Sequence, residues 1–256
     1  MILFMQRPLL SHPILLALVS FVVLWGAAHI GARISQLRRL ASKELEQFNL
    51  VLGATLTLLG LIVGFTFSMA VGRYDQRKNY EEEEANAIGT EYVRAQLLPT
   101  ADSDKVQALL KQYLAQRILF YEARTWDHLD DINRDTQQLQ NEMWSVVANA
   151  AKAQPTPVSA LAVAGMNDVL NRQGYTQAAW WNTIPKAAWA LMGGIALCCN
   201  VLIGMPASEV KTRVPLLVMP VMIAVAFMLL ADLDSPRGGI IRIAPQNLQS
   251  LWTSMR

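Results

Sequence analysis

The residues in this sequence most suited to binding an ion are two groups of carboxylates. One is the run of four glutamates at 81–84, and the other is the pair Asp232 and Asp234, which stands before a Ser-Pro-Arg-Gly turn. Carboxylate oxygens suit a hard cation such as Ca²⁺. Four successive helical residues, however, point around more than half of the helix circumference and cannot converge on one ion. We therefore expect the glutamate run to form a solvated helix face.

The acidic turn at Asp232 and Asp234 allows two interpretations. Its carboxylates could offer oxygen atoms to Ca²⁺. They could equally cap the end of the preceding apolar segment and pair with Arg237 or Arg242. We favour the structural interpretation, and we predict neither a metal ion nor another cofactor.

Groups able to carry out covalent chemistry are scattered along the chain. The histidines are His12, His29 and His128, and the only cysteines, Cys198 and Cys199, are neighbours within an apolar segment. The sequence has no paired-histidine zinc motif and no Cys-x-x-Cys. No nucleophile, base and orienting group can be assembled, so we do not expect an enzyme. With a net charge of +2 and no basic stripe, the chain is not expected to bind nucleic acid either.

Four long apolar segments dominate the chain, which is 53% hydrophobic and 16% charged. Each could cross a hydrocarbon core of about 30 Å as a helix, because roughly 20 helical residues suffice. The expected spans are about 13–32, 47–72, 187–207 and 214–231. The sequence therefore predicts an all-α membrane protein with four transmembrane helices. Its expected parts are a first hairpin (1–72), a helical soluble domain (73–184), a second hairpin (185–231) and a tail (232–256).

The first apolar segment has two features of a signal peptide, a basic start at Arg7 and an apolar core. It is long, however, and no small-x-small cleavage pattern directly follows a short core. We therefore expect it to remain in the protein as an anchor.

The polar region between the second and third spans is rich in helix formers and shows no β alternation. Apolar residues recur at three- and four-residue spacing over 109–121, which indicates an amphipathic helix. A second helix is expected over about 128–151. A shorter one then runs to about Arg172, with Gly174 as its expected stop.

The second span carries two stripes of residues and continues without proline into the charged segment that follows. The small stripe consists of Gly53, Gly60 and Gly64, and the larger one of Thr57, Leu61 and Phe65. Small residues let helix backbones approach closely in a membrane. The larger stripe could face lipid or a neighbouring helix. If several subunits placed this helix around an axis, it would instead form stacked apolar rings, which gate channels by dewetting.

Three segments of the chain resemble the bacterial bestrophin-like domain family of membrane proteins. They are GFTFS (64–68), EANAIGTEYVRAQLLP (84–99) and DLDSPRGG (232–239). A more distant resemblance connects the second span with the second transmembrane helix of bestrophin channels. That helix carries a Gly-Phe pair, then an arginine and an aromatic residue, which match Gly64, Phe65, Arg73 and Tyr74.

The resemblance implies a homo-oligomeric channel in the bacterial inner membrane, by analogy a pentamer, that conducts anions through a hydrophobic neck. Bestrophins are mainly anion-selective, and their second helix lines a hydrophobic neck before it enters a cytosolic helical domain. The residues implied here are Thr57, Leu61 and Phe65 for the neck, and Arg73, Arg77, Glu84 and Asn86 for the membrane exit and vestibule. The implied partners are further copies of the chain, membrane lipids and small ions. The alternative is a non-conducting membrane scaffold whose helical domain recruits a partner.

Three features depart from the bestrophin pattern. Thr57 stands where bestrophins usually have an aliphatic or aromatic residue. The acidic turn at 232–234 has fewer acids than the bestrophin calcium clasp, so calcium binding is not carried over. Glutamates near a vestibule would also repel anions unless they face away.

Positive charges near the membrane do not fix the orientation of the chain. Those on one side are Arg33, Arg38, Arg39, Lys43, Lys211 and Arg213, and those on the other are Arg73, Arg77, Lys78, Lys186, Arg237 and Arg242. Because the two sets are equal, the positive-inside rule does not decide. We adopt the bestrophin orientation, which predicts a cytoplasmic helical domain.

Overall fold

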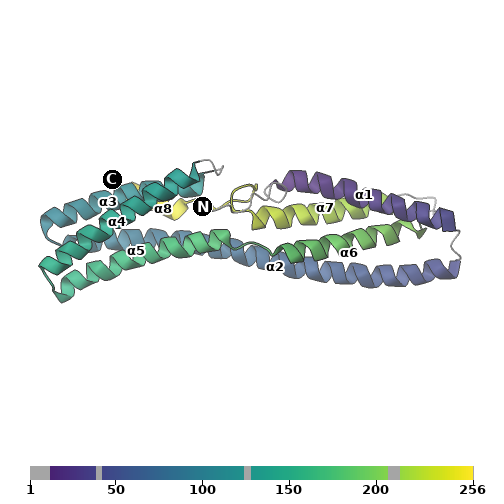
Figure 1. The fold of residues 1–256 in the computed structure, drawn as a ribbon, viewed down its shortest axis with the longest axis horizontal. Coiled ribbons are helices and arrows are strands. Elements are labelled where there is room, and N and C mark those ends of the chain that lie inside the picture. The colour runs from purple at the N-terminus through teal and green to yellow at the C-terminus, as the bar shows by residue number, and fades with distance from the viewer. Residues whose placement is uncertain (1–11, 39–41, 124–127, 207–213, 256) are drawn as a thin grey trace. The chain divides into compact units, whose positions relative to one another are not determined.

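The computed structural model of the chain describes residues 12–38, 42–123, 128–206 and 214–255, and within them every regular element is a helix (Figure 1). The predicted all-α fold class is confirmed. The chain divides into two compact units, residues 1–72 with 183–241 and residues 73–182 with 242–256. Arg39, Lys211 and Arg213, which entered the orientation count, lie outside the described residues.

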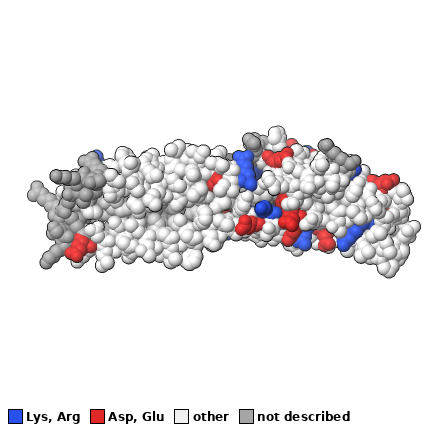
Figure 2. All heavy atoms as spheres, turned by 180° about the vertical axis from the view of Figure 1, so that it is seen from behind, with Lys and Arg blue, Asp and Glu red and all other residues white. Residues whose placement is uncertain are grey.

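The first unit is a bundle of apolar helices. It contains α1 (Pro13–Arg38), the first part of α2 (Ser42–Arg94), α6 (Lys186–Gly204) and α7 (Pro215–Asp234). The described helices include four stretches that are long and apolar enough to cross a membrane, as predicted. In the view of Figure 2, the first unit is nearly free of charged side chains, whereas these gather over the second unit.

Two glycines allow α1 and α6 to approach each other closely. A Cβ atom on Gly31 would collide with the backbone carbonyl of Val201, and one on Gly204 would collide with that of Ala28. Glycines at such positions let membrane helices pack backbone against backbone. Leu52 of α2 packs against the cluster formed here by Ala28 and its neighbours.

The second unit is a helical bundle with its own core. It contains the last part of α2, the short 3-10 helix η1 (Ala95–Leu97), α3 (Thr100–Glu122), α4 (Leu129–Ala153), α5 (Pro157–Trp181) and α8 (Gln246–Ser254). The amphipathic pattern over 109–121 buries Tyr113 and Phe120 of α3 completely or nearly so. The ring of Trp180 in α5 lies with its centroid 4.9 Å from that of Phe120.

Helix α5 is longer than the sequence predicts. It begins with a capping box in which the Thr156 hydroxyl accepts from the Ser159 backbone N–H, and it continues through Gly174 to Trp181. The predicted stop at Gly174 was therefore wrong. Thr176 and Trp180 are buried in the core of the second unit, and this packing outweighs the roughly 1 kcal/mol by which glycine weakens a helix interior.

The glycine contact between α1 and α6 leads to a stability prediction. Gly31→Val should lower the thermal midpoint of the detergent-solubilised protein, by an amount that corresponds to about 1–3 kcal/mol or more of overpacking. The matched control is Gly26→Val in the same helix, since no atom lies within 4 Å of a Cβ at that position. Equal midpoints for the two variants would contradict the assigned contact.

Candidate functional site

Helix α2 leaves one side uncovered along most of its length. The residues on this side recur at three- and four-residue spacing, and all are exposed in the chain; they are Thr57, Leu61, Phe65, Ser68, Gly72, Asp75, Asn79, Glu82 and Asn86. We call this set the exposed face of α2. Because α2 is one uninterrupted helix from Ser42 to Arg94, this spacing keeps these residues on one side of it.

The opposite side of α2 is packed against the rest of the chain. Its buried residues are Leu59, Thr66 and Ala70 in the first unit, and Arg77, Glu81, Glu84, Ala85, Ile88 and Glu91 in the second. Burial of α2 is therefore sparse in the first unit and dense in the second. None of the buried residues belongs to the exposed face.

The expected neck residues lie on the exposed face. Leu61 is 55% exposed and Phe65 is 65% exposed, although both are apolar. The Thr57 hydroxyl donates to the carbonyl oxygen of Gly53 at 2.9 Å, so its proton is used within the helix. In the membrane half, the exposed face thus offers the large apolar side chains of Leu61 and Phe65 and the hydroxyls of Thr57 and Ser68, and the Thr57 hydroxyl already donates within the helix.

The glycine stripe has no neighbour among the described residues of the chain. No atom lies within 4 Å of a Cβ built on Gly53, Gly60 or Gly64. The predicted helix contact at these glycines therefore stays a prediction, and it needs a helix from another subunit. Among the glycines of the described apolar helices of the first unit, those that pack closely within the chain are Gly31 and Gly204, which sequence reasoning missed because neither stands in a GxxxG pattern.

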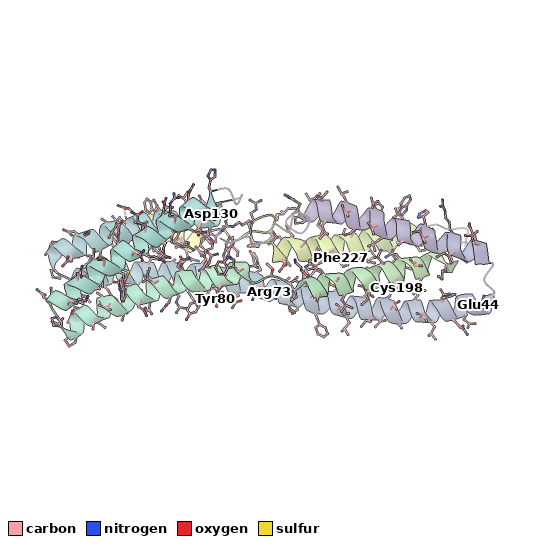
Figure 3. All side chains as sticks on the ribbon, in the orientation of Figure 1. Glu44, Arg73, Tyr80, Asp130, Cys198 and Phe227 are labelled. Carbon is pink, nitrogen blue, oxygen red and sulfur yellow. The ribbon has the colours of Figure 1, made fainter. Side chains whose placement is uncertain are left out.

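Arg77 lies on the packed side of α2 and holds the end of α5. Its Nε donates to the carbonyl of Ala179 at 3.1 Å, and its Nη2 donates to that of Asn182 at 3.0 Å. A cation is favourable at the C-terminus of a helix, where carbonyl groups lack partners. The structure thus places Arg77 in the core and not on the exposed face. Arg73, labelled in Figure 3, is partly buried.

The glutamate run is divided between the two sides of the helix. Glu81 accepts from the backbone N–H of Leu248 at 3.0 Å and from the Asn247 amide at 2.6 Å, so it caps α8. Glu83 pairs with Arg172 at 2.5 Å. Only Glu82 is exposed. The expectation of a solvated face was therefore wrong for the run as a whole.

Glu84 forms a fully buried ion pair with Arg117 of α3. Its other oxygen accepts from the Tyr121 hydroxyl at 3.3 Å and from the Thr176 hydroxyl at 3.2 Å. Burial lowers the pKa of Arg117, but the charge and hydrogen bond of Glu84, together with the nearby Tyr113 and Tyr121, outweigh burial, and the pKa of Arg117 is raised. Burial and the same carboxylate raise the pKa of Tyr121. Of the two predicted vestibule residues in this segment, only Asn86 lies on the exposed face.

Glu91 is a second fully buried carboxylate, at the contact between α2 and α5. A Cβ on Gly165 would collide with one of its oxygens, and neither oxygen has a hydrogen-bond partner among the described residues. Burial raises the pKa of Glu91 to about 8, although the charge of Arg94 opposes the shift and that of Asp168 adds to it.

The carboxylates of the acidic turn bind backbone N–H groups. Asp232 accepts from Ile240 at 2.5 Å and from Ile241 at 3.0 Å, and Asp234 accepts from Ile184 at 2.8 Å. A Cβ on Gly239 would collide with the Asp232 carboxylate, which accounts for glycine there. In the described part of the chain, no cluster of His, Cys, Asp and Glu has the geometry of a metal site.

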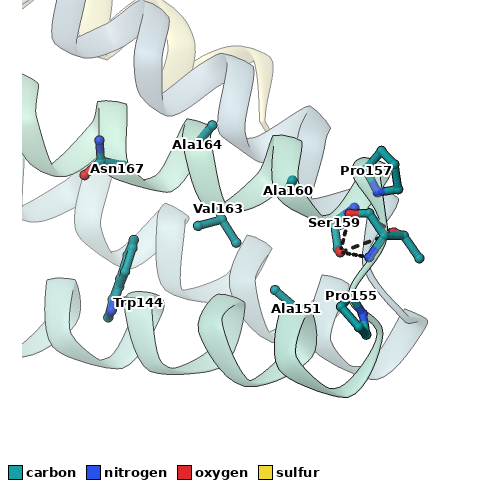
Figure 4. Close-up of a pocket in the computed structure, with 10 residues that line it drawn as sticks. Trp144, Ala151, Pro155, Pro157, Ser159, Ala160, Val163, Ala164 and Asn167 are labelled. Carbon is teal, nitrogen blue, oxygen red and sulfur yellow. Dashed lines mark hydrogen bonds between the residues drawn. The ribbon is translucent and has the colours of Figure 1, made fainter.

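A shallow hollow of about 640 Å³ lies between the end of α4 and the start of α5 (Figure 4). Trp144 and Val163 line it together with Pro155, Pro157 and small or polar residues. None of its lining side chains is acidic or basic, so the hollow offers no general acid or base.

Comparisons with known proteins agree with the sequence resemblance. A family model described as "Bestrophin-like domain" matches residues 14–248. Three solved structures of a bacterial bestrophin homologue from Klebsiella pneumoniae share the fold. A variant with tryptophan replaced by alanine has a TM-score of 0.66 at 13% identity and covers 93% of each chain. The structure phased by Zn-SAD has a TM-score of 0.65 at 13% sequence identity and covers 94% of this chain and 95% of that one. A variant with leucine replaced by threonine has a TM-score of 0.61 at 14% identity and covers 95% of this chain and 96% of that one. No protein of curated function matches the chain.

The Glu84–Arg117 pair leads to a prediction for the second unit. Arg117→Met should lower the thermal midpoint strongly, because removal of one partner from a buried pair costs about 3–5 kcal/mol. The matched control is Arg134→Met, since the Arg134 side chain is 70% exposed and pairs only at the surface. If the two variants had the same thermal midpoint, the Glu84–Arg117 pair would not stabilise the second unit.

Glu91 leads to a prediction about pH. Between pH 4.5 and about 8, the Glu91 carboxyl group keeps its proton in the folded chain and has released it in the unfolded chain. The folded state therefore loses stability as the pH rises, by at most about 1.4 kcal/mol per unit. Glu91→Gln should leave the thermal midpoint nearly unchanged at pH 5 and raise it relative to the unsubstituted chain at pH 8. A difference in thermal midpoint that does not change with pH, like the one expected for the exposed Glu142→Gln, would contradict the raised pKa of the Glu91 carboxyl group.

Proposed function

The chain belongs to the bestrophin-like family, and on that premise we propose that it forms a homo-oligomeric ion channel whose exposed α2 face lines the pore. The observation that carries the proposal is the face itself. It is uncovered along a helix whose buried residues lie on the opposite side, and the large apolar residues on it, Leu61 and Phe65, are followed after Gly72 by polar ones. A helix that lines a narrow apolar constriction in the membrane and then a water-filled vestibule outside it needs this order of apolar and polar residues.

The proposed constriction consists of rings of Leu61 and Phe65. Several copies of α2 around an axis would stack these side chains one turn apart, and stacked apolar rings gate channels by dewetting. Thr57 would form the ring on the other side of Leu61. Its hydroxyl already donates within the helix at 2.9 Å, which makes this ring less polar than a free hydroxyl would.

The glycine stripe supports the arrangement around an axis. Gly60 and Gly64 stand next to Leu61 and Phe65 along the chain, so they flank the exposed face. In a ring of helices, residues that flank the axis-facing side meet the next helix. Small residues at that position let the backbones approach closely, and none of the described residues of the same chain fills this space.

The proposal includes the bacterial inner membrane as the location, a cytoplasmic position for the second unit and a pentamer as the assembly. These parts rest on the resemblance to bestrophins. Ion permeation needs no covalent step, so the scattered histidines and cysteines have no catalytic role in it. The alternative, a non-conducting scaffold, would use the same exposed face only for helix packing.

The neck predicts the effect of smaller side chains. Leu61→Ala combined with Phe65→Ala should raise single-channel conductance several-fold in a planar bilayer, because smaller groups widen and wet the constriction. The matched control is Leu18→Ala with Val22→Ala, which shortens two exposed apolar side chains of α1. Unchanged conductance in a correctly assembled double variant would count against the neck, and silence of the assembled unsubstituted protein would favour the scaffold.

A further inference from the structure

We infer that the contact between the end of α2 and the first half of α5 is a proton-controlled switch, which is closed while the Glu91 carboxyl group is protonated and opens when it ionises. The switch differs from the loss of stability predicted above, because it is a local movement of α5 within a second unit that stays folded. It acts whether or not the chain conducts ions.

The Glu91 carboxyl group lies in the core of the second unit with no group bonded to it. Glu91 is 0% exposed, and neither of its oxygens has a hydrogen-bond partner among the described residues. A buried carboxylate without a partner is strongly unfavourable, so burial holds the group in its neutral form. Since its pKa is about 8, a small rise above neutral pH is enough to create the unfavourable charge.

The backbone of α5 is packed directly onto this carboxyl group at Gly165. A Cβ atom at Gly165 would collide with a Glu91 oxygen and would lie 2.8 Å from Nη1 of Arg94. Gly165 is therefore in contact with the acid and close to the cation that stands one turn further along α2. Because α5 covers the carboxyl group at this point, water reaches an ionised Glu91 when α5 moves away from α2.

The charges around Glu91 favour separation of the two helices once it ionises. Arg94 lies on the same helix and attracts the carboxylate, whereas Asp168 lies on α5 and repels it across the contact. The α3 cations that contact α2, Lys111 and Arg117, are engaged with other side chains. None of the charged residues of α4 is buried. Ionisation thus adds a repulsion between α2 and α5 that the protonated form lacks.

The first half of α5 is held differently from its end. The end is bonded to α2 through Arg77, which donates to two carbonyls there, whereas the first half is held by the buried apolar side chains of Ala162, Met166 and Val169. On its α4 side, the start of α5 borders the hollow of about 640 Å³ shown in Figure 4. Gly174 lies between the two parts with no atom within 4 Å of a Cβ, and glycine changes its backbone conformation at little cost. Gly174 is therefore the point at which α5 bends when its first half moves.

The test is hydrogen exchange of the detergent-solubilised full chain at pH 6 and pH 9, measured by mass spectrometry on peptides from residues 157–169. At pH 6 the unsubstituted chain and Glu91→Gln should exchange equally, because both carry a neutral group. At pH 9 the unsubstituted chain should exchange about tenfold faster in this segment, since each pH unit above the pKa corresponds to about a tenfold change in the equilibrium. Residues 106–121 of α3 should exchange equally in the two chains at both pH values.

Two further variants identify the titrating group by the sign of the charge that they remove. Asp168→Asn should lower the pH at which residues 157–169 lose protection, because Asp168 raises the pKa of Glu91, and Arg94→Gln should raise that pH, because Arg94 lowers the pKa. A purely structural role of the two residues would not move the midpoint in opposite directions. Asp168 is exposed, so its variant leaves the core intact and tests the switch even where Glu91→Gln does not fold.

Three results would overturn the switch. Equal exchange of the unsubstituted chain and Glu91→Gln at pH 9 would show that ionisation does not open the contact. Faster exchange that extends equally to α3 would show unfolding of the whole unit instead of a local movement. A midpoint that neither Asp168→Asn nor Arg94→Gln moves would show that Glu91 is not the group that titrates.

Discussion

The rotation of α2 about its own axis is fixed by three charged residues on its packed side, and this rotation decides which residues of the helix stay exposed. Arg77 binds the carbonyls at the end of α5, Glu81 caps the start of α8, and Glu84 forms a buried pair with Arg117 of α3. Each contact matches a charge to a helix terminus or to an opposite charge, so a rotation of α2 would break all three and leave buried charges unpaired. Since these residues face inward, Asp75 and Glu82 must face outward.

The membrane half of α2 obeys a different constraint. Helices in lipid gain little from burying apolar surface and associate through close packing. Within the first unit, this packing occurs at Gly31 and Gly204, between α1 and α6. The glycines of α2 lie outside that contact, beside the exposed Leu61 and Phe65. These glycines form a second small-residue surface that no described residue of the chain contacts, and this is the surface on which we propose that a neighbouring copy packs.

Sequence reasoning predicted the spans because hydrocarbon thickness and the absence of charge between Glu46 and Arg73 leave few alternatives. It could not assign the four glutamates, since neighbouring identical side chains differ only in where the helix turns them. Arg117, the partner of Glu84, is 33 residues away and is recognisable only once α3 has folded back. The same limit explains Gly174, where tertiary packing overrides propensity, and α8, which was expected as a tail. The neck residues came from resemblance, and their exposure became visible only with the packed side of α2.

The central claim is that the exposed face of α2 borders water in an assembled pore. It is tested most directly by a charged thiol reagent applied to channels that carry one cysteine, in a background where Cys198 and Cys199 are replaced by alanine. Ser68 lies on the exposed face, and Phe67 is the preceding residue, turned about 100° away and also exposed. If the exposed face borders water, the reagent should change the current through Ser68→Cys channels and leave Phe67→Cys channels unaffected. Modification of Phe67→Cys alone, or equal insensitivity of both in conducting channels, would contradict this claim.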